Sequence, residues 1–151
     1  MHPVPHAARK EFERAGKSAE KGANHEAIQH LRKALAIYPD YAEAHNDLGV
    51  GYLRQAAYAE AVAEFQAAIA LDSSAARPLS NLAIAWVALR RYRDAEFTAR
   101  RAISLDPGFA SAKRALDLAI ARVIILPNPP KTQSPPEPRM EASSLTVQQG
   151  R

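Results

Sequence analysis

A pair of glycines in residues 46–61, NDLGVGYLRQAAYAEA, has a spacing that could support chemistry. One residue separates Gly49 from Gly51, as in the turns whose backbone N–H groups bind the phosphates of a dinucleotide. Such a turn follows a strand and carries a third glycine after Tyr52 and Leu53, and the sequence provides neither. The same spacing suits a helix whose backbone packs closely against a neighbour. We therefore interpret Gly49 as a packing residue.

The five histidines lack the spacing of metal ligands or of catalytic bases. His2 and His6 are four residues apart, but the two prolines between them oppose the helix that would bring them together. His25 and His30 are five apart and fall on different faces of a helix. The chain has no cysteine, and the motifs HExxH, GxSxG and GxxxxGK are absent. We expect no catalytic residue, no cofactor and no metal ion.

The elements that would position any site repeat along the chain every 34 residues. The blocks 27–39 (AIQHLRKALAIYP), 61–73 (AVAEFQAAIALDS) and 95–107 (AEFTARRAISLDP) align without a gap. Apolar residues within the blocks recur at steps of three and four, which is the period of an amphipathic helix. Pro39 and Pro107 close two of the blocks, because the residue before a proline disfavours the helical conformation. The sequence therefore predicts two helices in every 34 residues.

This pattern resembles the tetratricopeptide repeat, whose helices pack through small residues. The small positions of that repeat are matched by Ala15, Gly49, Ala83, Ala27, Ala61, Ala95, Ala34, Ala68 and Ala102. Its large positions are matched by Leu48, Leu82, Tyr52, Trp86, Tyr58, Tyr92, Leu31 and Phe65. The first repeat departs from the pattern, with Arg14 and Ser18 where Leu and Tyr are expected. The resemblance implies an all-α, right-handed α-solenoid of antiparallel helix pairs.

The predicted organisation follows from the 34-residue frame and from a change in composition at Pro127. Its parts are a disordered N-terminus at 1–7, repeats at 8–41, 42–75 and 76–109, a capping helix at 110–126 and a disordered tail at 127–151. The tail is rich in proline and poor in large apolar residues, so it cannot form a core of its own. Residues 135–138 fit a PxxP ligand, although a linker role is the interpretation we favour.

The last predicted helix ends the stack, because Asp117 occupies a position where a further helix would require a small residue. Its apolar stripe consists of Ala112, Leu116, Ala119, Ile120 and Val123. In the arrangement that we favour, this stripe covers the third repeat as a cap. In the alternative, residues 112–126 pair with a second copy of the chain, since unfinished solenoid ends expose core residues.

Five arginines form the most conspicuous charged feature: Arg90, Arg91, Arg93, Arg100 and Arg101. Asp94 and Glu96 interrupt this cluster. The whole chain has a net charge of +4 and a pI of about 9.6, which gives it a mild attraction to polyanions. Solubility explains the Arg90–Arg101 cluster best. Contact with an acidic protein or with nucleic-acid phosphates is the alternative.

The resemblance implies a concave groove lined by the first helix of each repeat. We expect the groove to be lined by Asn46, Val50, Leu53, Arg54, Arg77, Ser80, Asn81, Ile84, Val87, Arg114, Leu118 and Arg122. An apolar strip bordered by arginines suits a peptide or partner helix with one or two apolar anchors and acidic flanks. Asn46 and Asn81 can each hold a backbone amide of that ligand. Packing between repeats is the alternative role of part of the strip.

Chaperone tails that end in a carboxylate are one ligand class of this family, and the residues here argue against it. The family's clamp takes Lys and Asn from the first repeat, where this chain has Phe12 and Gly16. Asp47 replaces the Asn of the second repeat and would repel a carboxylate. In the third repeat the clamp's Lys and Arg correspond to Arg77 and Asn81, so that only Arg77 is a tolerable match. We do not expect a chaperone-tail clamp.

No apolar run marks a signal peptide, and the longest aliphatic run, 123–126, is far shorter than the roughly 20 residues that cross a bilayer. We expect a cytoplasmic, non-enzymatic protein that makes no membrane contact. Its predicted function is to bind another protein in the concave groove. The alternatives are a scaffold that self-associates through residues 112–126, and weak binding of an acidic partner or nucleic acid through the Arg90–Arg101 cluster.

Overall fold

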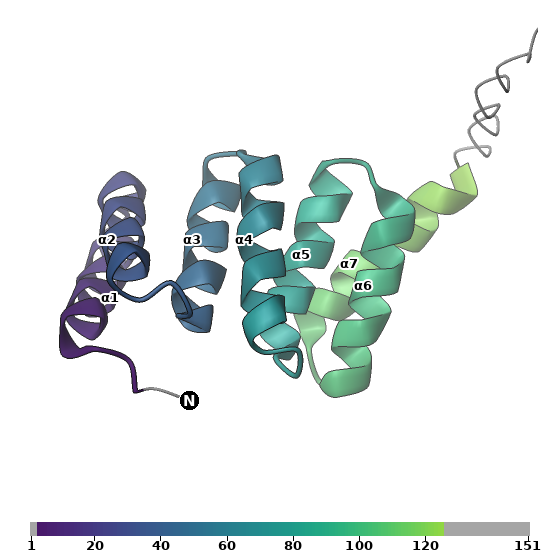
Figure 1. Cartoon of the computed structure of the whole chain (residues 1–151). Coiled ribbons are helices and arrows are strands. Elements are labelled where there is room, and N and C mark those ends of the chain that lie inside the picture. The colour runs from purple at the N-terminus through teal and green to yellow at the C-terminus, as the bar shows by residue number, and fades with distance from the viewer. Residues whose placement is uncertain (1–2, 126–151) are drawn as a thin grey trace, which may run out of the picture.

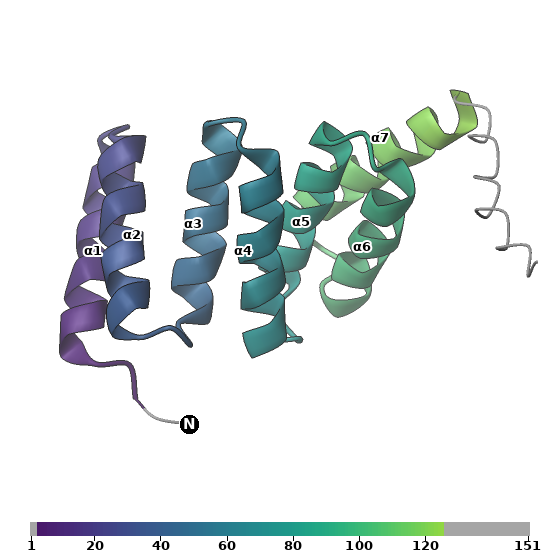
Figure 2. The same ribbon diagram turned by 45° about the horizontal axis from the view of Figure 1, so that its top comes forward.

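Seven α-helices make up the regular structure of residues 3–125, which are the residues that the computed structural model describes. In chain order the helices are α1 (His6–Glu20), α2 (Asn24–Ile37), α3 (Ala42–Arg54), α4 (Tyr58–Leu71), α5 (Ala76–Ala88), α6 (Tyr92–Leu105) and α7 (Ala110–Ile125). Three antiparallel pairs, α1 with α2, α3 with α4 and α5 with α6, stack side by side (Figures 1 and 2). Helix α7 packs against both helices of the last pair. The predicted all-α solenoid of helix pairs is confirmed.

The first helix of every pair ends in the same hydrogen-bonded turn. Gly22, Ala56 and Arg90 are 34 residues apart and have φ angles of 75°, 56° and 59°, in the left-handed region. The next residue donates its N–H to a carbonyl five residues back, as Ala57 does to Tyr52 at 3.0 Å. Glycine adopts this conformation without strain. In Ala56 and Arg90, by contrast, the Cβ crowds the following carbonyl.

The second helix of every pair ends in an extended residue. Tyr38, Asp72 and Asp106 have φ angles of −138°, −138° and −139°, and each donates its N–H to the last turn of its helix. Pro39 and Pro107 follow two of them and favour this extended conformation. The repeat period therefore fixes where each helix stops as well as where it packs.

Helix α1 begins earlier than the predicted disordered segment 1–7 allows. Its first residue is His6, with Pro5 at the N-cap at φ −57° and accepting the N–H of Arg9 at 3.0 Å. Val4 packs against the core of the first pair. A proline at this point supports the helix, because its fixed φ matches the helix entry. The predicted tail, 127–151, lies outside the described residues.

Small residues bring the helices together along the whole stack. All nine small residues that match the repeat pattern are buried: Ala15, Ala27, Ala34, Gly49, Ala61, Ala68, Ala83, Ala95 and Ala102. Phe65 on α4 is 0% exposed and lies against Gly49 on α3. A Cβ added at Gly49 would lie 2.6 Å from the Cε1 atom of that ring. Because real Cβ atoms almost never approach so closely, the position requires glycine.

Candidate functional site

A hollow of about 390 Å³ lies between α1, α3 and α5. The residues that line this inner hollow include Phe12, Glu43, Asn46, Asp47, Asp72 and Arg77. A smaller hollow of about 180 Å³ lies between α1, α2 and α3 and shares Asp47 with the first. Of the predicted groove residues, Asn46 and Arg77 line the larger hollow, and Val50 and Arg54 line the smaller.

A chain of hydrogen bonds connects α5 to two residues of α3 that line the inner hollow. Asn81 on α5 donates through Nδ2 to Asn46 Oδ1 on α3 at 3.0 Å. Asn46 then donates through its own Nδ2 to Asp47 Oδ1, also at 3.0 Å. We expected Asn46 to hold the amide of a ligand, but its side chain is buried and already paired. It therefore joins α3 to α5 and positions Asp47.

Ser80 is buried rather than exposed on the groove surface. Its side chain is 0% exposed, and its hydroxyl lies 2.7 Å from the hydroxyl of Ser111 on α7. A buried hydroxyl without a partner is destabilising, so this pair keeps α7 seated against α5. The sequence frame placed Ser80 among the ligand-binding residues. The structure instead assigns it to the contact between these two helices.

Asp47 lies where partial desolvation disfavours the ionised form of its carboxyl group. Burial raises the pKa of this carboxyl above 3.8, while the hydrogen bond from Asn46 and the charges of Arg77 and Arg54 act in the opposite direction. Within residues 3–125, neither Arg54 nor Arg77 forms an ion pair shorter than 4.0 Å. The inner face therefore offers arginines without a carboxylate partner among the described residues, beside one unfavourably placed carboxylate.

The predicted apolar strip is only partly exposed. Val50, Leu53 and Val87 pack against a buried core cluster. Ile84 and Leu118 are 37% and 53% exposed, respectively. The apolar area that a ligand could cover is therefore concentrated on α5 and α7, and the remainder of the strip holds the repeats together.

Helix α7 both covers the stack and carries predicted groove residues. Ala112 and Ala119 are 0% exposed, in clusters with residues of α5 and α6. Arg114, Arg122 and Leu118 are exposed. The buried side of α7 supports its interpretation as a cap. Self-association through residues 112–126 stays a prediction.

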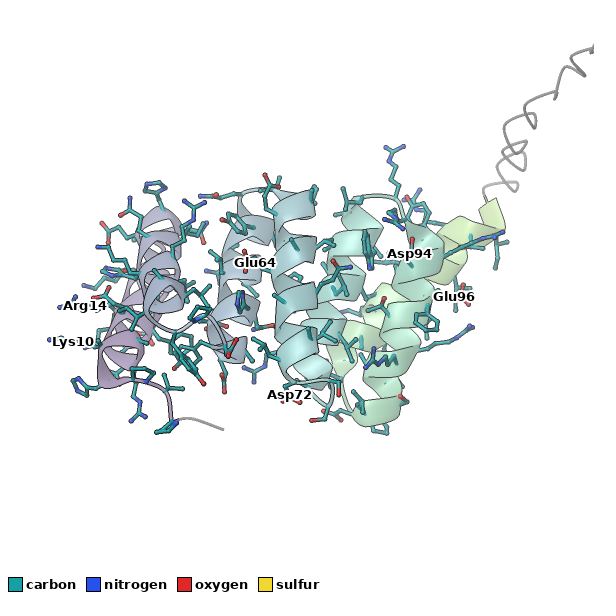
Figure 3. The ribbon with its side chains drawn as sticks, viewed as in Figure 1. Lys10, Arg14, Glu64, Asp72, Asp94 and Glu96 are labelled. Atoms are coloured by element: carbon teal, nitrogen blue, oxygen red, sulfur yellow. The ribbon has the colours of Figure 1, made fainter. Side chains whose placement is uncertain are left out.

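The Arg90–Arg101 cluster lies around α6 and is partly neutralised. Arg91 donates through Nε to Asp94 at 2.8 Å, and its guanidinium lies 4.2 Å from the centre of the Trp86 ring. Arg100 pairs with Glu96 at 2.6 Å, one helical turn away. Figure 3 labels both carboxylates, Asp94 and Glu96, on this helix. The cluster is thus a mixed surface with a remaining positive charge.

A family model described as TPR repeat, which denotes the tetratricopeptide repeat, matches residues 19–56, from the end of α1 through α3. The first repeat domain of Spaghetti (RPAP3), bound to the HSP90 peptide SRMEEVD, superposes with a TM-score of 0.76 at 23% identity. The match covers 78% of this chain and 94% of that chain. Residues 19–56 therefore match the tetratricopeptide repeat, and the described helices have the fold of a tetratricopeptide-repeat domain.

Further solved structures share the same fold. The first tetratricopeptide-repeat domain of human RPAP3 has a TM-score of 0.76 at 24% identity, over 80% of this chain and 95% of that chain. The TPR2B domain of yeast Sti1, in complex with pHsp70, has a TM-score of 0.72 at 18% identity, over 81% and 100%. No curated protein matches the chain in sequence. The architecture is the right-handed α-solenoid expected of tetratricopeptide repeats.

Residues 3–125 contain no group of three His, Cys, Asp or Glu side chains arranged to hold a metal ion. None of the helices in that range is long and apolar enough to span a bilayer.

Sequence reasoning missed one exposed aromatic residue of the third repeat. Phe97 on α6 is 74% exposed, and it contributes to a third hollow, between α4, α5 and α6. Its counterparts 34 and 68 residues earlier are Ala63 and Gln29, which are also exposed. The signal was present in the repeat alignment, as a large apolar residue at a position that is otherwise small or polar.

Proposed function

We propose that this chain is a non-catalytic interaction module that holds a peptide or a partner helix on its inner face. The observation that carries the proposal is the inner hollow. Arg77 lines this hollow and has no carboxylate partner within residues 3–125. Further along α5, the apolar side chain of Ile84 is 37% exposed. Preformed apolar concavities with a few polar groups are the usual form of a binding site.

The residues of this face favour a ligand with apolar anchors and acidic flanks. Ile84 and Leu118 supply apolar area for the anchors, and Arg77 and Arg114 attract carboxylates. Asn81 donates to Asn46 through Nδ2, which leaves its carbonyl oxygen to accept from a ligand backbone. An extended peptide or one face of a helix can make these contacts.

Two of the similar domains were solved with chaperone ligands, an HSP90 peptide for Spaghetti and pHsp70 for Sti1. These structures support a peptide as the ligand class. They do not extend to a chaperone tail here, because Asp47 lies beside Arg77 and opposes a terminal carboxylate. Phe12 also stands where the clamp of the family takes a lysine. We propose a different acidic segment as the ligand.

The test is affinity capture from a lysate of the source organism with three forms of the full chain. One bait is the wild type and the second is Arg77→Glu/Leu118→Glu, which changes two exposed groups of the inner face. The third is Lys33→Glu/Ile37→Glu, which makes the same kind of change on the exposed side of α2. All three should melt at similar temperatures, because the four residues are exposed.

The proposal expects partners that the wild type and the α2 variant retain and the inner-face variant loses. Mass spectrometry of the captured proteins gives this comparison directly. Identical partners on all three baits would contradict the proposal, and the working surface would then be elsewhere on the molecule.

A further inference from the structure

Polar side-chain contacts link α2 to α3, across the joint between the first two helix pairs, and α3 to α4 within the second pair. Arg32 on α2 donates through Nη2 to the hydroxyl of Tyr52 on α3 at 2.7 Å. His45 on α3 donates through Nδ1 to Glu64 Oε2 on α4, also at 2.7 Å, since an ionised carboxylate can only accept. These two contacts bridge α2, α3 and α4.

The corresponding positions around the joint between the second and third pairs carry none of these four polar side chains. The residues that stand in their places, 34 positions later, are Gln66, Leu79, Trp86 and Thr98. All four line a hollow of about 400 Å³ between α4, α5 and α6, which we call the outer hollow. Its floor is apolar, with Leu79 and Leu82 only 2% and 6% exposed. The volume is within the range of roughly 300–1,000 Å³ that is usual for ligand pockets.

Phe97 stands at the rim of the outer hollow and is 74% exposed. The earlier repeats carry Ala63 and Gln29 at this position, so the aromatic ring is not required by the repeat itself. An exposed aromatic residue beside an apolar hollow has the character of an interface anchor, because contact with a partner would remove its ring from water.

The charge around the outer hollow is positive. Asp94 lines the hollow but is paired with Arg91 at 2.8 Å. Arg101 lines it too, and its contact within the described residues is a long hydrogen bond of 3.4 Å to the carbonyl of Ser73. A partner that covers this surface therefore meets an apolar floor and a guanidinium without a carboxylate partner among residues 3–125.

We infer that the outer hollow is a second docking site, separate from the inner groove, for an acidic protein segment that carries a bulky apolar side chain. The apolar side chain enters the hollow against Leu79 and Phe97, and a neighbouring Asp or Glu of the segment pairs with Arg101. Nucleic acid fits less well, because the carboxylates Asp94 and Glu96 stand among the arginines and the floor is apolar.

Trp86 makes the inference directly measurable. It is the single tryptophan of the chain and it lines the outer hollow, so its emission reports what enters. The probe is a displayed library of random 12-residue peptides, selected on the full chain. Enriched peptides are then synthesised and titrated while Trp86 fluorescence is recorded.

The variants separate this site from the inner groove. Phe97→Gln/Arg101→Glu changes the outer hollow, and glutamine is the residue of the first repeat at the position of Phe97. The matched control is Leu105→Gln/Lys33→Glu, which changes an exposed apolar residue and a cation elsewhere. The groove variant Arg77→Glu/Leu118→Glu completes the set. Circular dichroism and melting confirm that each variant is folded.

The inference predicts enriched peptides with a large apolar residue beside Asp or Glu, which shift the Trp86 emission. Their affinity should fall roughly tenfold or more in the outer-hollow variant and stay unchanged in the other two. It is overturned if no acidic-apolar pattern is enriched, or if the enriched peptides bind the outer-hollow variant as well as the wild type. Loss of binding in the groove variant alone would support the proposed function and overturn this inference.

Three other occupants of the hollow would also overturn it. If the wild type is a dimer and Phe97→Gln is a monomer, the occupant of the hollow is a second copy of the chain. If Leu145→Glu changes the Trp86 emission in the absence of peptide, the occupant of the hollow is the segment 127–151 of the same chain. Salt-sensitive binding of double-stranded DNA that Arg101→Glu abolishes, with no peptide enriched, would show a nucleic-acid surface.

Discussion

At the scale of single residues, Gly49 sets the distance between α3 and α4. A Cβ at this position would lie 2.6, 2.8 and 2.9 Å from three atoms of the Phe65 ring, which is fully buried. We predict that Gly49→Leu lowers the free energy of unfolding by about 1–3 kcal/mol through overpacking. Chemical denaturation measures this loss.

Gly16 provides the matched control for that prediction. It lies within α1, and a Cβ there would meet no atom within 4 Å. Gly16→Ala should therefore raise the free energy of unfolding by about 0.5–1 kcal/mol, because alanine loses less backbone entropy in a helix. Equal stability of Gly49→Leu and the wild type would show that Gly49 does not hold the two helices together.

Glu11 links the two helices of the first pair and makes their stability depend on pH. The hydrogen bond that His30 donates to it, at 2.7 Å, lowers the pKa of Glu11 below 4.5. A carboxyl whose pKa is lowered by folding adds stability above its ordinary pKa, and that contribution is lost as the pH falls through the folded value. We predict that the difference in unfolding free energy between wild type and Glu11→Gln narrows from about pH 7 to about pH 3.

Urea unfolding at a series of pH values measures that difference. The control is Glu20→Gln, at the exposed end of α1. A difference that stays constant across the series would contradict the role given to the Glu11–His30 contact.

The sequence predicted on which side of its helix each groove residue lies, but not which residue it would contact. The resemblance to the tetratricopeptide repeat, applied in the 34-residue frame, implied that Asn46, Ser80 and Ile84 lie on the groove side of their helices. Whether such a side chain is open to a ligand depends on what the neighbouring helix presents. Ser111 forms a hydrogen bond with Ser80, and Asn81 forms one with Asn46. The pattern within one repeat does not predict these contacts, because each joins a residue of one repeat to a residue outside that repeat.

At the scale of elements, the left-handed turns after α3 and α5 carry strain that the turn after α1 avoids. Ala56 has a φ of 56°, where its repeat counterpart is Gly22. We predict that Ala56→Gly stabilises the protein by about 1 kcal/mol, because glycine has no Cβ to crowd the carbonyl. Thermal melting should show an increase of a few degrees.

Two further variants serve as controls for the Ala56→Gly measurement. Gly22→Ala should lower stability by a similar amount, since it introduces the same strain. Ala57→Gly, at the next residue with φ −82°, should bring no gain. A destabilised Ala56→Gly would mean that the side chain of Ala56 contributes more than its strained backbone costs.

The order and type of the helices were predictable from the repeat, because its small residues, its apolar steps and its prolines all point to the same pairs. The entry into α1 was missed, since Pro3 and Pro5 were interpreted only as helix breakers. Phe97 and the outer hollow were not predicted for another reason. The repeat pattern specifies the small and large residues that pack between helices, whereas Phe97 and its counterparts Ala63 and Gln29 are exposed.

At the scale of the whole molecule, Asp47 relates the stability of the stack to what the inner face can bind. Its pKa is raised by burial, so the folded state binds its proton more tightly than the unfolded state. The ionised carboxyl therefore destabilises the fold at neutral pH, and this penalty disappears as the pH falls below about 3.8. We predict that Asp47→Asn is at least as stable as wild type at pH 7 and has no advantage in acid.

The same variant should bind an acidic ligand roughly two- to fivefold more tightly, as expected when one partly exposed repulsive charge is removed. Calorimetric titration with the partner segment identified by capture measures this change. Weaker binding by a stable Asp47→Asn would mean that Asp47 attracts the ligand, and the ligand would then be basic at that point.

We propose that the inner face of the solenoid is the surface that holds a partner. The most direct measurement is an amide chemical-shift map of the labelled full chain, titrated with the partner segment. We predict that the largest shifts fall on the inner positions of α3, α5 and α7, at Arg54, Arg77, Ile84 and Leu118. Shifts confined to α6 and the rim around Phe97, with the inner face unchanged, would contradict the claim.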